Sequence, residues 1–332
     1  NKAVDNVSFD IKQGEVFGLV GESGCGKTTT GRAIIKLYDI TGGNVYFMGQ
    51  RISAGTKYYK DAISKARSEK KRCGDEKRLA QLDKIIADNK AEISAAKACN
   101  KNVDRKLVNR IQMIFQDPIA SLDPRMTVRD IIAEGLVIKG IKDKEYIDRK
   151  VYEMLETVGL VREHASRYPH EFSGGQRQRI GVARAVIMEP SLIIADEPIS
   201  ALDVSIRAQV MNLLNDLRRK MGLTIMFIAH DLSVVKYFSD RIGVMYYGHL
   251  VELADSDELF RHPLHPYTRS LLSAIPQPDP RYEKSRKRIV YNPVADHDYR
   301  NSSPTFREVS KEHFVLCSDA EFEKYKDIVS KG

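Results

Sequence analysis

Short apolar runs alternate with helical patterns along most of this chain. Each run has four to six residues and is rich in Val, Ile, Leu or Phe. The runs lie at residues 16–20, 111–115, 192–195, 224–229 and 242–247. Between them, apolar residues recur every three or four positions, as on the buried face of a helix. Strands that alternate with helices in this way predict an α/β fold with a largely parallel sheet.

Other segments depart from this alternation. Residues 7–11 place Val, Phe and Ile in alternation with polar residues, which predicts a half-exposed strand. Residues 41–49 indicate a glycine turn followed by a strand, and residues 249–253 indicate a last strand that pairs with residues 242–247. The final fifty residues predict only a small appendage.

Residues 53–108 are rich in Lys, Ala, Glu and Asp, and four Leu and Ile residues between positions 79 and 93 recur at helical spacing. We therefore predict one or two charged helices. Residues 57–110 hold sixteen Lys/Arg and eight Asp/Glu, so their surplus equals the net charge of the whole chain, +8. Two interpretations stay open: a solvated insertion without chemistry, or a contact with anionic lipid headgroups or an acidic partner.

The four cysteines lie far apart, with no Cys-x-x-Cys pair and no histidine at metal spacing. We expect reduced thiols, with neither a disulfide framework nor a zinc site. Cys25 would be open to alkylation if it is exposed. No run approaches the roughly 18 apolar residues of a membrane span, and the N-terminus shows no secretory pattern. The expected location is the cytoplasm, unless another molecule tethers the protein.

A glycine-rich loop follows the first apolar run and precedes a helical pattern. Gly21-Glu22-Ser23-Gly24-Cys25-Gly26-Lys27-Thr28-Thr29 matches G-x-x-x-x-G-K-[ST] at every fixed position. Glycines let successive backbone N–H groups turn toward a phosphate, while the helix N-terminus and Lys27 add positive charge. The Thr28 hydroxyl would hold Mg²⁺. The alternative is a tight turn with a satisfied lysine, but the context predicts binding of a nucleoside triphosphate.

Two carboxylates follow the run at residues 192–195. Asp196 can hold Mg²⁺ opposite Thr28, and Glu197 is the natural group to polarise an attacking water. The alternative for Glu197 is a carboxylate that only pairs with a neighbouring base. Ser173 is the expected N-cap of the helix that Gly174-Gly175-Gln176 opens.

In their order and surroundings, these elements resemble ATP-binding cassette (ABC) ATPases over roughly residues 1–275. The most specific element is Ser173-Gly174-Gly175-Gln176, although Phe172 stands where the family usually has leucine. The resemblance implies that this signature segment caps the ATP held by a second subunit. Two ATPs would then join two head-to-tail subunits, and hydrolysis would let them separate.

The resemblance also assigns roles to residues that the pattern alone leaves ambiguous. It implies that His230 contacts the γ-phosphate and orients the water, although a histidine after a buried strand is more often structural. It implies that Gln116 touches Mg²⁺ and that Asp203 signals across the dimer. The predicted catalytic residues are Lys27, Glu197 and His230. The predicted ATP contacts are Gly21, Glu22, Ser23, Gly24, Cys25, Gly26, Lys27, Thr28, Thr29 and Gln116, and the predicted Mg²⁺ ligands are Thr28, Gln116 and Asp196.

The expected architecture is an α/β, ABC-type P-loop ATPase with a mainly parallel core sheet, an antiparallel β subdomain, a helical subdomain and a small C-terminal appendage. The ATPase domain would span residues 1–255, with the charged insertion at about 53–108 and the helical subdomain at about 117–180. Residues 256–332 would form an extension of the type found in oligopeptide importers.

Two further segments narrow the resemblance to one subfamily of ABC ATPases. Residues 262–272 and 114–128 look like those of ATP-binding subunits of oligopeptide and dipeptide importers. This implies a subunit that powers peptide import by ATP-driven dimer closure. Its implied partners are a similar but distinct second ATPase subunit, two transmembrane permease subunits and an extracellular peptide-binding protein. It would work at the cytoplasmic face of the cell membrane, bound to the permease.

Two departures from the family pattern and one alternative complete these expectations. Cys317 is alone in the tail, so we expect no iron–sulfur cluster. The aromatic residue that usually stacks on adenine would lie upstream of Lys2, which indicates a missing N-terminal segment. The alternative function is a soluble ABC ATPase that acts on nucleic acid through the basic insertion. Only Tyr58 and Tyr59 could stack on bases there, and we do not expect nucleic acid as a partner.

Overall fold

The computed structural model of the chain describes residues 2–275, 288–297, 299 and 302–331, which divide into two compact units. The first unit joins the N-terminal segment up to Thr28 with the residues from Arg110 onward. The second unit is Thr29–Asn109. Helix α1 (Lys27–Ile34) begins in the first unit and continues into the second.

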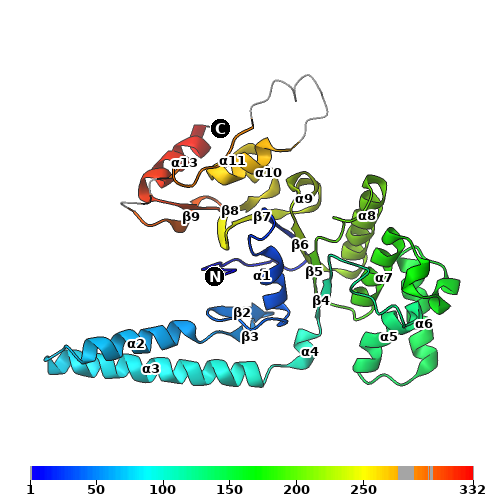
Figure 1. The fold of residues 1–332 in the computed structure, drawn as a ribbon, viewed down its shortest axis with the longest axis horizontal. Helices are drawn as coiled ribbons and strands as arrows, with labels where there is room; N and C mark the ends of the chain where they lie inside the picture. The colour runs from blue at the N-terminus through cyan, green and yellow to red at the C-terminus, as the bar shows by residue number, and fades with distance from the viewer. Residues whose placement is uncertain (1, 276–287, 298, 300–301, 332) are drawn as a thin grey trace. The chain divides into compact units, whose positions relative to one another are not determined.

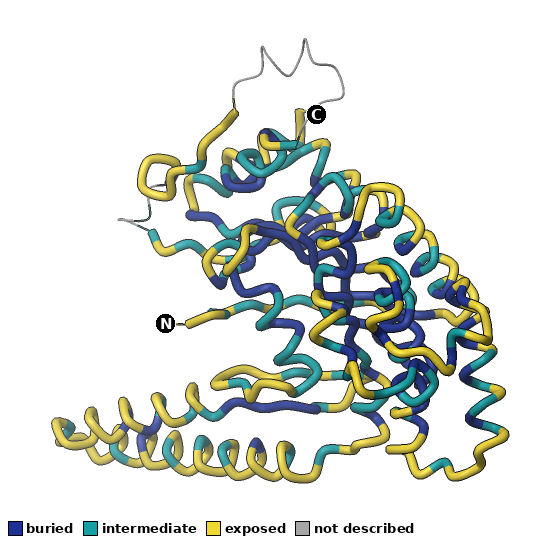
Figure 2. The backbone as a smooth tube through the Cα atoms, turned by 45° about the vertical axis from the view of Figure 1, so that its right-hand side comes forward, coloured by how far each residue is buried: buried dark blue, intermediate teal, exposed yellow. Residues whose placement is uncertain are grey.

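An eight-stranded sheet forms the centre of the first unit (Figure 1). In spatial order its strands are β4 (Ile111–Ile114), β5 (Leu192–Asp196), β6 (Thr224–Ala229), β1 (Val16–Val20), β7 (Arg241–Tyr246), β8 (His249–Asp255), β10 (His313–Cys317) and β9 (Thr305–Ser310). The first five are parallel to one another, and the last three continue the sheet in antiparallel pairs. Strands β1, β5 and β6 are buried along their whole length, as strands covered on both faces are (Figure 2). The mixed, mainly parallel sheet is confirmed.

Three helices form a group beside the β4 end of this sheet: α5 (Val128–Ile138), α6 (Lys144–Thr157) and α7 (Gly174–Val186) (Figure 1). They pack on one another, and α7 also packs against β4. Between α6 and α7 lie the short 3₁₀ helices η1 (Arg162–Ser166) and η2 (Pro169–Glu171). Gly159, which follows the end of α6, has φ +73°, a conformation that glycine adopts without strain.

The remaining helices of the first unit lie between or after the other strands. They are α8 (Val204–Met221), α9 (Leu232–Phe238), α10 (Ser256–Arg261), α11 (Pro266–Ser273) and α13 (Asp319–Lys331). Helix α9 packs against β1 and β6, and α10 packs against β8. Helix α8 has Val210, Leu214 and Leu217 on its buried face and ends at Gly222, as its periodicity predicts.

The C-terminal segment is more closely integrated than the predicted appendage. Strand β10 pairs with β8, and β9 pairs with β10, so both belong to the central sheet. Behind them, Leu264, Val315, Cys317 and Tyr325 form a small buried cluster. The sequence predicted only an appendage here, because the place of these two strands in the sheet depends on the pairing of β10 with β8.

The strand predicted at residues 7–11 is wrong. Residues 7–11 belong to neither sheet of the described chain. Phe9 instead stacks on Phe17 of β1, with ring centroids 5.0 Å apart. The alternation of apolar residues therefore reflects packing of an extended segment on the core, not strand pairing.

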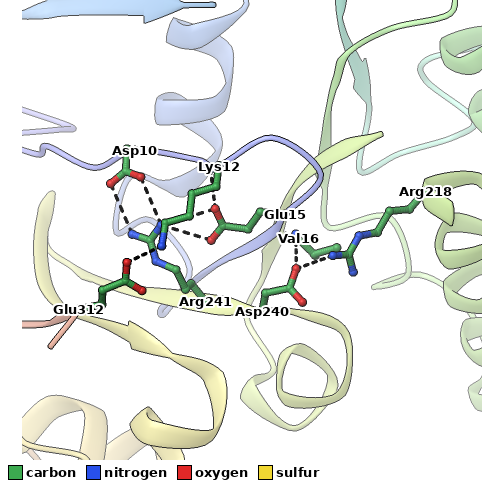
Figure 3. A network of polar contacts seen from close by, with 8 residues as sticks. All are labelled: Asp10, Lys12, Glu15, Val16, Arg218, Asp240, Arg241 and Glu312. Atoms are coloured by element: carbon green, nitrogen blue, oxygen red, sulfur yellow. Dashed lines mark hydrogen bonds and ion pairs between the residues drawn. The ribbon is translucent and has the colours of Figure 1, made fainter. Parts of the chain in front are cut away.

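A network of ion pairs fixes the start of β1 (Figure 3). The Asp240 carboxylate accepts hydrogen bonds from the Val16 N–H (2.8 Å) and from Arg218 (2.7 Å). Arg241, which is buried, lies 3.4 Å from both Glu15 and Asp10. These charged groups hold the strand that leads directly into the glycine-rich loop.

The second unit contains a two-stranded antiparallel sheet and a helical hairpin. The sheet consists of β2 (Asn44–Phe47) and β3 (Gln50–Ala54), joined at Met48 and Gly49, which both have positive φ. We name α2 (Lys57–Lys70) and α3 (Glu76–Lys101) the helical hairpin, and the short α4 (Arg105–Val108) follows it. Most of its residues are exposed, as Figure 2 shows in yellow. The prediction of one or two charged helices is confirmed.

Candidate functional site

The sheet brings several sequence-predicted residues to one edge. Because β4, β5, β6 and β1 are parallel, their C-terminal ends meet at the same edge, where ligands bind in open α/β sheets. Gln116 follows β4, Asp196 and Glu197 end β5, His230 follows β6, and the glycine-rich loop follows β1. We name Lys27, Thr28, Gln116, Asp196, Glu197 and His230 the strand-end cluster.

The glycine-rich loop needs glycine at several positions. Gly21, Gly24 and Gly26 have φ of +150°, +82° and +109°. A Cβ on Gly21 would lie 2.2 Å from the Met245 carbonyl oxygen, and one on Gly26 would lie 2.4 Å from the Ala3 carbonyl oxygen. Both distances are shorter than any real Cβ contact, so side chains are excluded there. The backbone can thus wrap closely around a small anion.

Lys27 lies under this loop and is only 4% exposed. Its Nζ donates to the carbonyl oxygens of Gly21 (2.7 Å) and Glu22 (2.9 Å). The ammonium group is therefore satisfied by the loop itself, and a bound phosphate would replace these carbonyls as its partner.

Cys25 is buried, and its Sγ lies 3.8 Å from Lys27 Nζ. Burial raises the pKa of the Cys25 thiol above its ordinary value, against the opposing effect of the Lys27 charge. The thiol form is the less reactive one. The exposure on which alkylation of Cys25 depended is therefore missing, and we no longer expect it to react readily.

Thr28 and Asp196 meet at the edge of the sheet. The Thr28 hydroxyl donates to Asp196 Oδ1 at 2.8 Å, and Asp196 is 1% exposed. A hydroxyl and a carboxylate are the hard oxygen donors that Mg²⁺ prefers, and Mg²⁺ usually takes only one or two of them from the protein. In the described part of the chain, no group of three or more His, Cys, Asp or Glu could hold a metal ion. The Thr28–Asp196 pair supplies oxygen donors that would fit a magnesium ion, which would take its remaining ligands from other oxygen groups.

Glu197 contacts two other residues of the strand-end cluster, Gln116 and His230. Its Oε2 accepts a hydrogen bond from Gln116 Nε2 (3.2 Å) and lies 3.1 Å from His230 Nδ1. An ionised carboxylate only accepts, so Nδ1 carries the proton in this contact. The carboxylate is thus oriented from two sides by residues that follow β4 and β6. It can accept a proton from a water that attacks a phosphate.

The backbone of Glu197 is held in an unusual conformation. Its φ is +43°, which non-glycine residues rarely adopt. Its N–H donates to the Ile228 carbonyl (2.9 Å), and its carbonyl accepts from Ser200 Oγ (3.1 Å). Such conformations cost about 1–3 kcal/mol and persist where the surroundings enforce them, often at functional sites. Here the turn separates the directions of the consecutive Asp196 and Glu197 side chains.

The signature segment stands at the N-terminus of α7. Ser173 is its N-cap, as predicted: Ser173 Oγ accepts from Gln176 N (3.3 Å), and Gln176 Oε1 accepts from Ser173 N (3.0 Å). A Cβ on Gly175 would lie 2.5 Å from Ile206 Cγ2, so glycine is needed for α7 to approach α8 closely. A Cβ on Gly174 would meet only an ordinary contact, 3.7 Å from Leu202.

The signature segment and the glycine-rich loop are attached to different strands of the sheet. Helix α7 packs on the edge strand β4, whereas the loop follows β1, three strands away. At a strand spacing of about 4.8 Å, three strands correspond to about 14 Å. The two segments are therefore not brought together as the other residues are. Asp203 lies at the N-cap position of α8, is exposed, and makes no side-chain cap hydrogen bond.

Sequence reasoning missed one residue at this edge. Tyr267 of α11 accepts a hydrogen bond from the backbone N–H of Glu22 at 3.0 Å. The segment around it was interpreted only as part of a family-specific tail. No local pattern connects residues 245 positions apart, so only the resemblance of the tail drew attention to it.

Comparison with known proteins gives the class that this fold and site define. The model of the family described as ABC transporter matches residues 4–105 and 77–200, and that of the oligopeptide/dipeptide transporter C-terminal region matches residues 251–300. The chain belongs to the ABC transporter family, and it is an ABC-type ATPase.

Two similar relatives are named as transport proteins for particular substrates. The chain is 54% identical to the oligopeptide transport ATP-binding protein OppF of Bacillus subtilis, over 98% of this chain and 92% of the relative. It is 50% identical to the dipeptide transport ATP-binding protein DppF of Lactococcus lactis subsp. cremoris, over 98% and 91%.

Solved structures share the fold. That of cbiO1 from Clostridium perfringens, part of the ABC transporter complex cbiONQ, has a TM-score of 0.57 at 23% identity and covers 79% of this chain and 85% of its own. A dimeric post-hydrolysis state of the ATP-binding cassette MJ0796, bound to ADP and Pi, has a TM-score of 0.56 at 25% identity and covers 76% and 90%. The predicted fold class is confirmed.

Proposed function

We propose that this chain is the ATP-hydrolysing subunit of an importer for oligopeptides or dipeptides, and that ATP drives the closure of two such subunits. The importer assignment is supported by the transport ATP-binding proteins to which the chain is similar over 98% of its length. The match of residues 251–300 to the peptide-transporter C-terminal region supports it independently of the ATPase core. The alternative action on nucleic acid is not favoured, because these relatives are named as transport proteins.

The glycine-rich loop would hold the ATP phosphates. Backbone N–H groups of the loop would turn toward the anion, apart from those of Glu22 and Cys25, which have partners within the chain, and Lys27 would exchange its two loop carbonyls for phosphate oxygens. Thr28 and Asp196 would hold Mg²⁺, with Gln116 as a further ligand. When bound, Mg²⁺ neutralises charge on the β- and γ-phosphates.

Glu197 would act as the general base, and the single observation that carries this role is its position between Gln116 and His230. Both partners donate to the same oxygen, Oε2. That arrangement fixes the carboxylate and leaves Oε1 to accept a proton from water. His230, whose side chain is 55% exposed, can also reach a γ-phosphate that enters this edge.

The signature segment would complete the site of a second subunit. Ser173, Gly174, Gly175 and Gln176 form a helix N-terminus, which suits the γ-phosphate of a partner's ATP. The separation of α7 from the loop by three strands supports an ATP shared between two chains rather than enclosed by one. The exposed Asp203 would sense the partner at this interface.

The remaining partners and the location follow from the same assignment. We propose a second, similar but non-identical ATPase subunit, two transmembrane permeases and an extracellular peptide-binding protein. None of the helices in the described part of the chain is long and apolar enough to cross a membrane. The proposed place is the cytoplasmic face of the cell membrane, with residues 1–255 as the ATPase domain and 256–332 as the importer-type extension.

The decisive variant is Glu197→Gln. It keeps the size and hydrogen-bonding capacity of the side chain but removes the basic carboxylate, so ATP turnover should fall by at least about 100-fold. ATP should then hold the subunits together as stable dimers, which light scattering after size-exclusion chromatography detects. Lys27→Ala is the comparison, because it should weaken ATP binding strongly and give no dimers at the same ATP concentration. Unchanged turnover in Glu197→Gln would remove Glu197 from its role, and ATP-bound monomers would contradict the shared site.

Peptide import needs a separate experiment. The native complex, purified from membranes through a tag on this chain, should contain permease subunits and a peptide-binding protein. When it is reconstituted in vesicles, ATP should drive uptake of a labelled tripeptide. Co-purification with an efflux permease instead would contradict the importer assignment while leaving the ATPase intact.

A further inference from the structure

The C-terminal segment reaches the glycine-rich loop through one side chain. Tyr267 is the second residue of α11 and is only 2% exposed. Its hydroxyl oxygen accepts the backbone N–H of Glu22 at 3.0 Å. Glu22 itself has an exposed side chain, so this contact ties an otherwise open part of the loop to a buried residue.

A buried carboxylate fixes the start of α11. Glu252 of β8 is fully buried and accepts the N–H groups of Leu264 (2.8 Å) and His265 (3.0 Å). It also lies 2.9 Å from Nε2 of the buried His313. His265 in turn caps α11, because its Nδ1 accepts the Tyr267 N–H at 3.1 Å. The backbone of Tyr267 is thus anchored to the central sheet.

Aromatic packing fixes the ring of Tyr267. Its centroid lies 4.4 Å from that of Tyr246, which ends β7, and 5.5 Å from that of Tyr291. Rings at these distances restrict one another's rotation. The hydroxyl therefore has a set position, which an isolated surface tyrosine would lack.

Glu22, the loop residue that Tyr267 contacts, also contacts Lys27. The N–H of Glu22 is held by Tyr267, and its carbonyl accepts from Lys27 Nζ at 2.9 Å. Both polar groups of this one residue are thereby fixed. When a phosphate takes Lys27 away from the carbonyl, Glu22 keeps the bond of its N–H to Tyr267 and the longer bond of its carbonyl to the Cys25 N–H (3.3 Å).

We propose that Tyr267 is a positioning residue for ATP: it holds Glu22 so that the loop and Lys27 keep the geometry that binds phosphate. The C-terminal segment thereby sets the affinity of the ATP site from outside the parallel strands. The inference rests on the proposed role of Lys27 in phosphate binding.

The variant that tests this is Tyr267→Phe, which removes the hydroxyl and keeps the ring. The Glu22 N–H then has no partner from α11 and the loop can relax. We expect the Kd for ATP to rise about fivefold, as for one lost hydrogen bond, with kcat at saturating ATP changed less than twofold. Tyr246→Phe is the matched control, because it removes a hydroxyl from the adjoining ring and keeps the hydrogen bond between Tyr267 and the Glu22 N–H. Equal Kd values in Tyr267→Phe and wild type would overturn the proposal.

A double-mutant cycle separates positioning from general stability. If Tyr267 acts through Glu22 and Lys27, Tyr267→Phe should weaken ATP binding less than twofold in a Lys27→Ala background. A fivefold effect in both backgrounds would overturn the proposed route. If Lys27→Ala alone left the Kd for ATP unchanged, the proposed function of the loop would fail first, and the two failures are thus distinguishable.

Hydrogen exchange keeps the proposal testable if Tyr267→Phe folds poorly. In the wild-type chain without nucleotide, the Glu22 amide should exchange slowly although its residue is exposed. It should exchange at least tenfold faster in Tyr267→Phe and at the wild-type rate in Tyr246→Phe. Rapid exchange in the wild-type chain would show that the hydrogen bond does not persist in solution, and would overturn the proposal.

Discussion

The strand-end cluster and the helical hairpin are built in opposite ways. The cluster collects residues from positions 27 to 230, and each follows or ends a buried strand. The hairpin is one continuous stretch whose buried residues are mainly Ile63, Ala66, Leu82 and Ala96. A site that needs several groups within hydrogen-bonding distance is positioned by long-range sheet register, whereas the hairpin needs only contact between two neighbouring helices.

This difference predicts where substitutions matter. In the cluster, a change of one polar group should affect chemistry strongly and stability little. In the hairpin, only the few buried residues should matter, because most charged groups there face water, where single ion pairs contribute about 0–1 kcal/mol.

The largest effect should come from His230→Ala. Loss of the imidazole leaves Glu197 with Gln116 as its remaining side-chain donor in the cluster, so turnover should fall about 100-fold. The Kd for ATP should change less than threefold, because the loop and Lys27 are intact. Steady-state kinetics with a separate binding assay measures both. Normal turnover would show that His230 has only a structural role.

The C-terminal segment allows a test by pH. Burial, and then the charges of His297 and Arg269, lowers the pKa of His265 from 6.5 to about 3. Between these values the unfolded chain binds a proton that the folded chain does not, so stability falls as the pH decreases through this window. From pH 7 to pH 4 the loss should be about 3 kcal/mol.

His265→Asn is the matched variant for this pH test. Asparagine can still cap α11 and cannot titrate, so its stability should fall less over the same range. Urea unfolding at several pH values measures the difference between the two chains. Parallel pH profiles would show that His265 does not carry the loss.

Leu82→Ala tests the hairpin itself. Leu82 is 1% exposed, and its truncation should cost about 2 kcal/mol, the lower end for a buried leucine, because two helices can close partly over the gap. Hydrogen exchange of α2 and α3 should accelerate together. Ile85→Ala, at an exposed position of the same helix, is the control and should leave exchange nearly unchanged. A faster rate confined to one turn would mean that the hairpin does not unfold as one unit.

The smallest effect should follow charge reversal at the hairpin tip. Lys71→Glu with Arg72→Glu alters exposed residues in the turn between α2 and α3. We expect a stability change within about 0.5 kcal/mol and unchanged ATP turnover. Thermal unfolding and steady-state kinetics measure these. A large loss of turnover would show that the hairpin takes part in catalysis and would break the contrast with the cluster.

Much of the cluster could be predicted because local sequence carries it. Short apolar runs located the parallel strands and Glu197 directly after one of them, whereas the resemblance to ABC ATPases singled out Gln116 and His230. Ser173 as the N-cap of α7 was likewise readable from local spacing. Their roles toward ATP stay proposals.

What the sequence could not give depends on distant contacts. The left-handed backbone of Glu197 follows from the pairing of its N–H with Ile228, and nothing at position 197 signals it. Val7, Phe9 and Ile11 alternate as a strand would, yet they belong to neither sheet, and Phe9 stacks on Phe17 of β1. The bond between Tyr267 and Glu22 joins residues 245 positions apart.

Both halves of the proposed nucleotide site are closed upon themselves. Lys27 donates to its own loop, and the Gln176 amide in the first turn of α7 is capped by Ser173. Nucleotide arrival is therefore an exchange of partners rather than a gain of new ones, and the net free energy is modest even though each contact is strong. Such a balance favours rapid release of the nucleotide after hydrolysis. Two subunits that must separate in every cycle require this release.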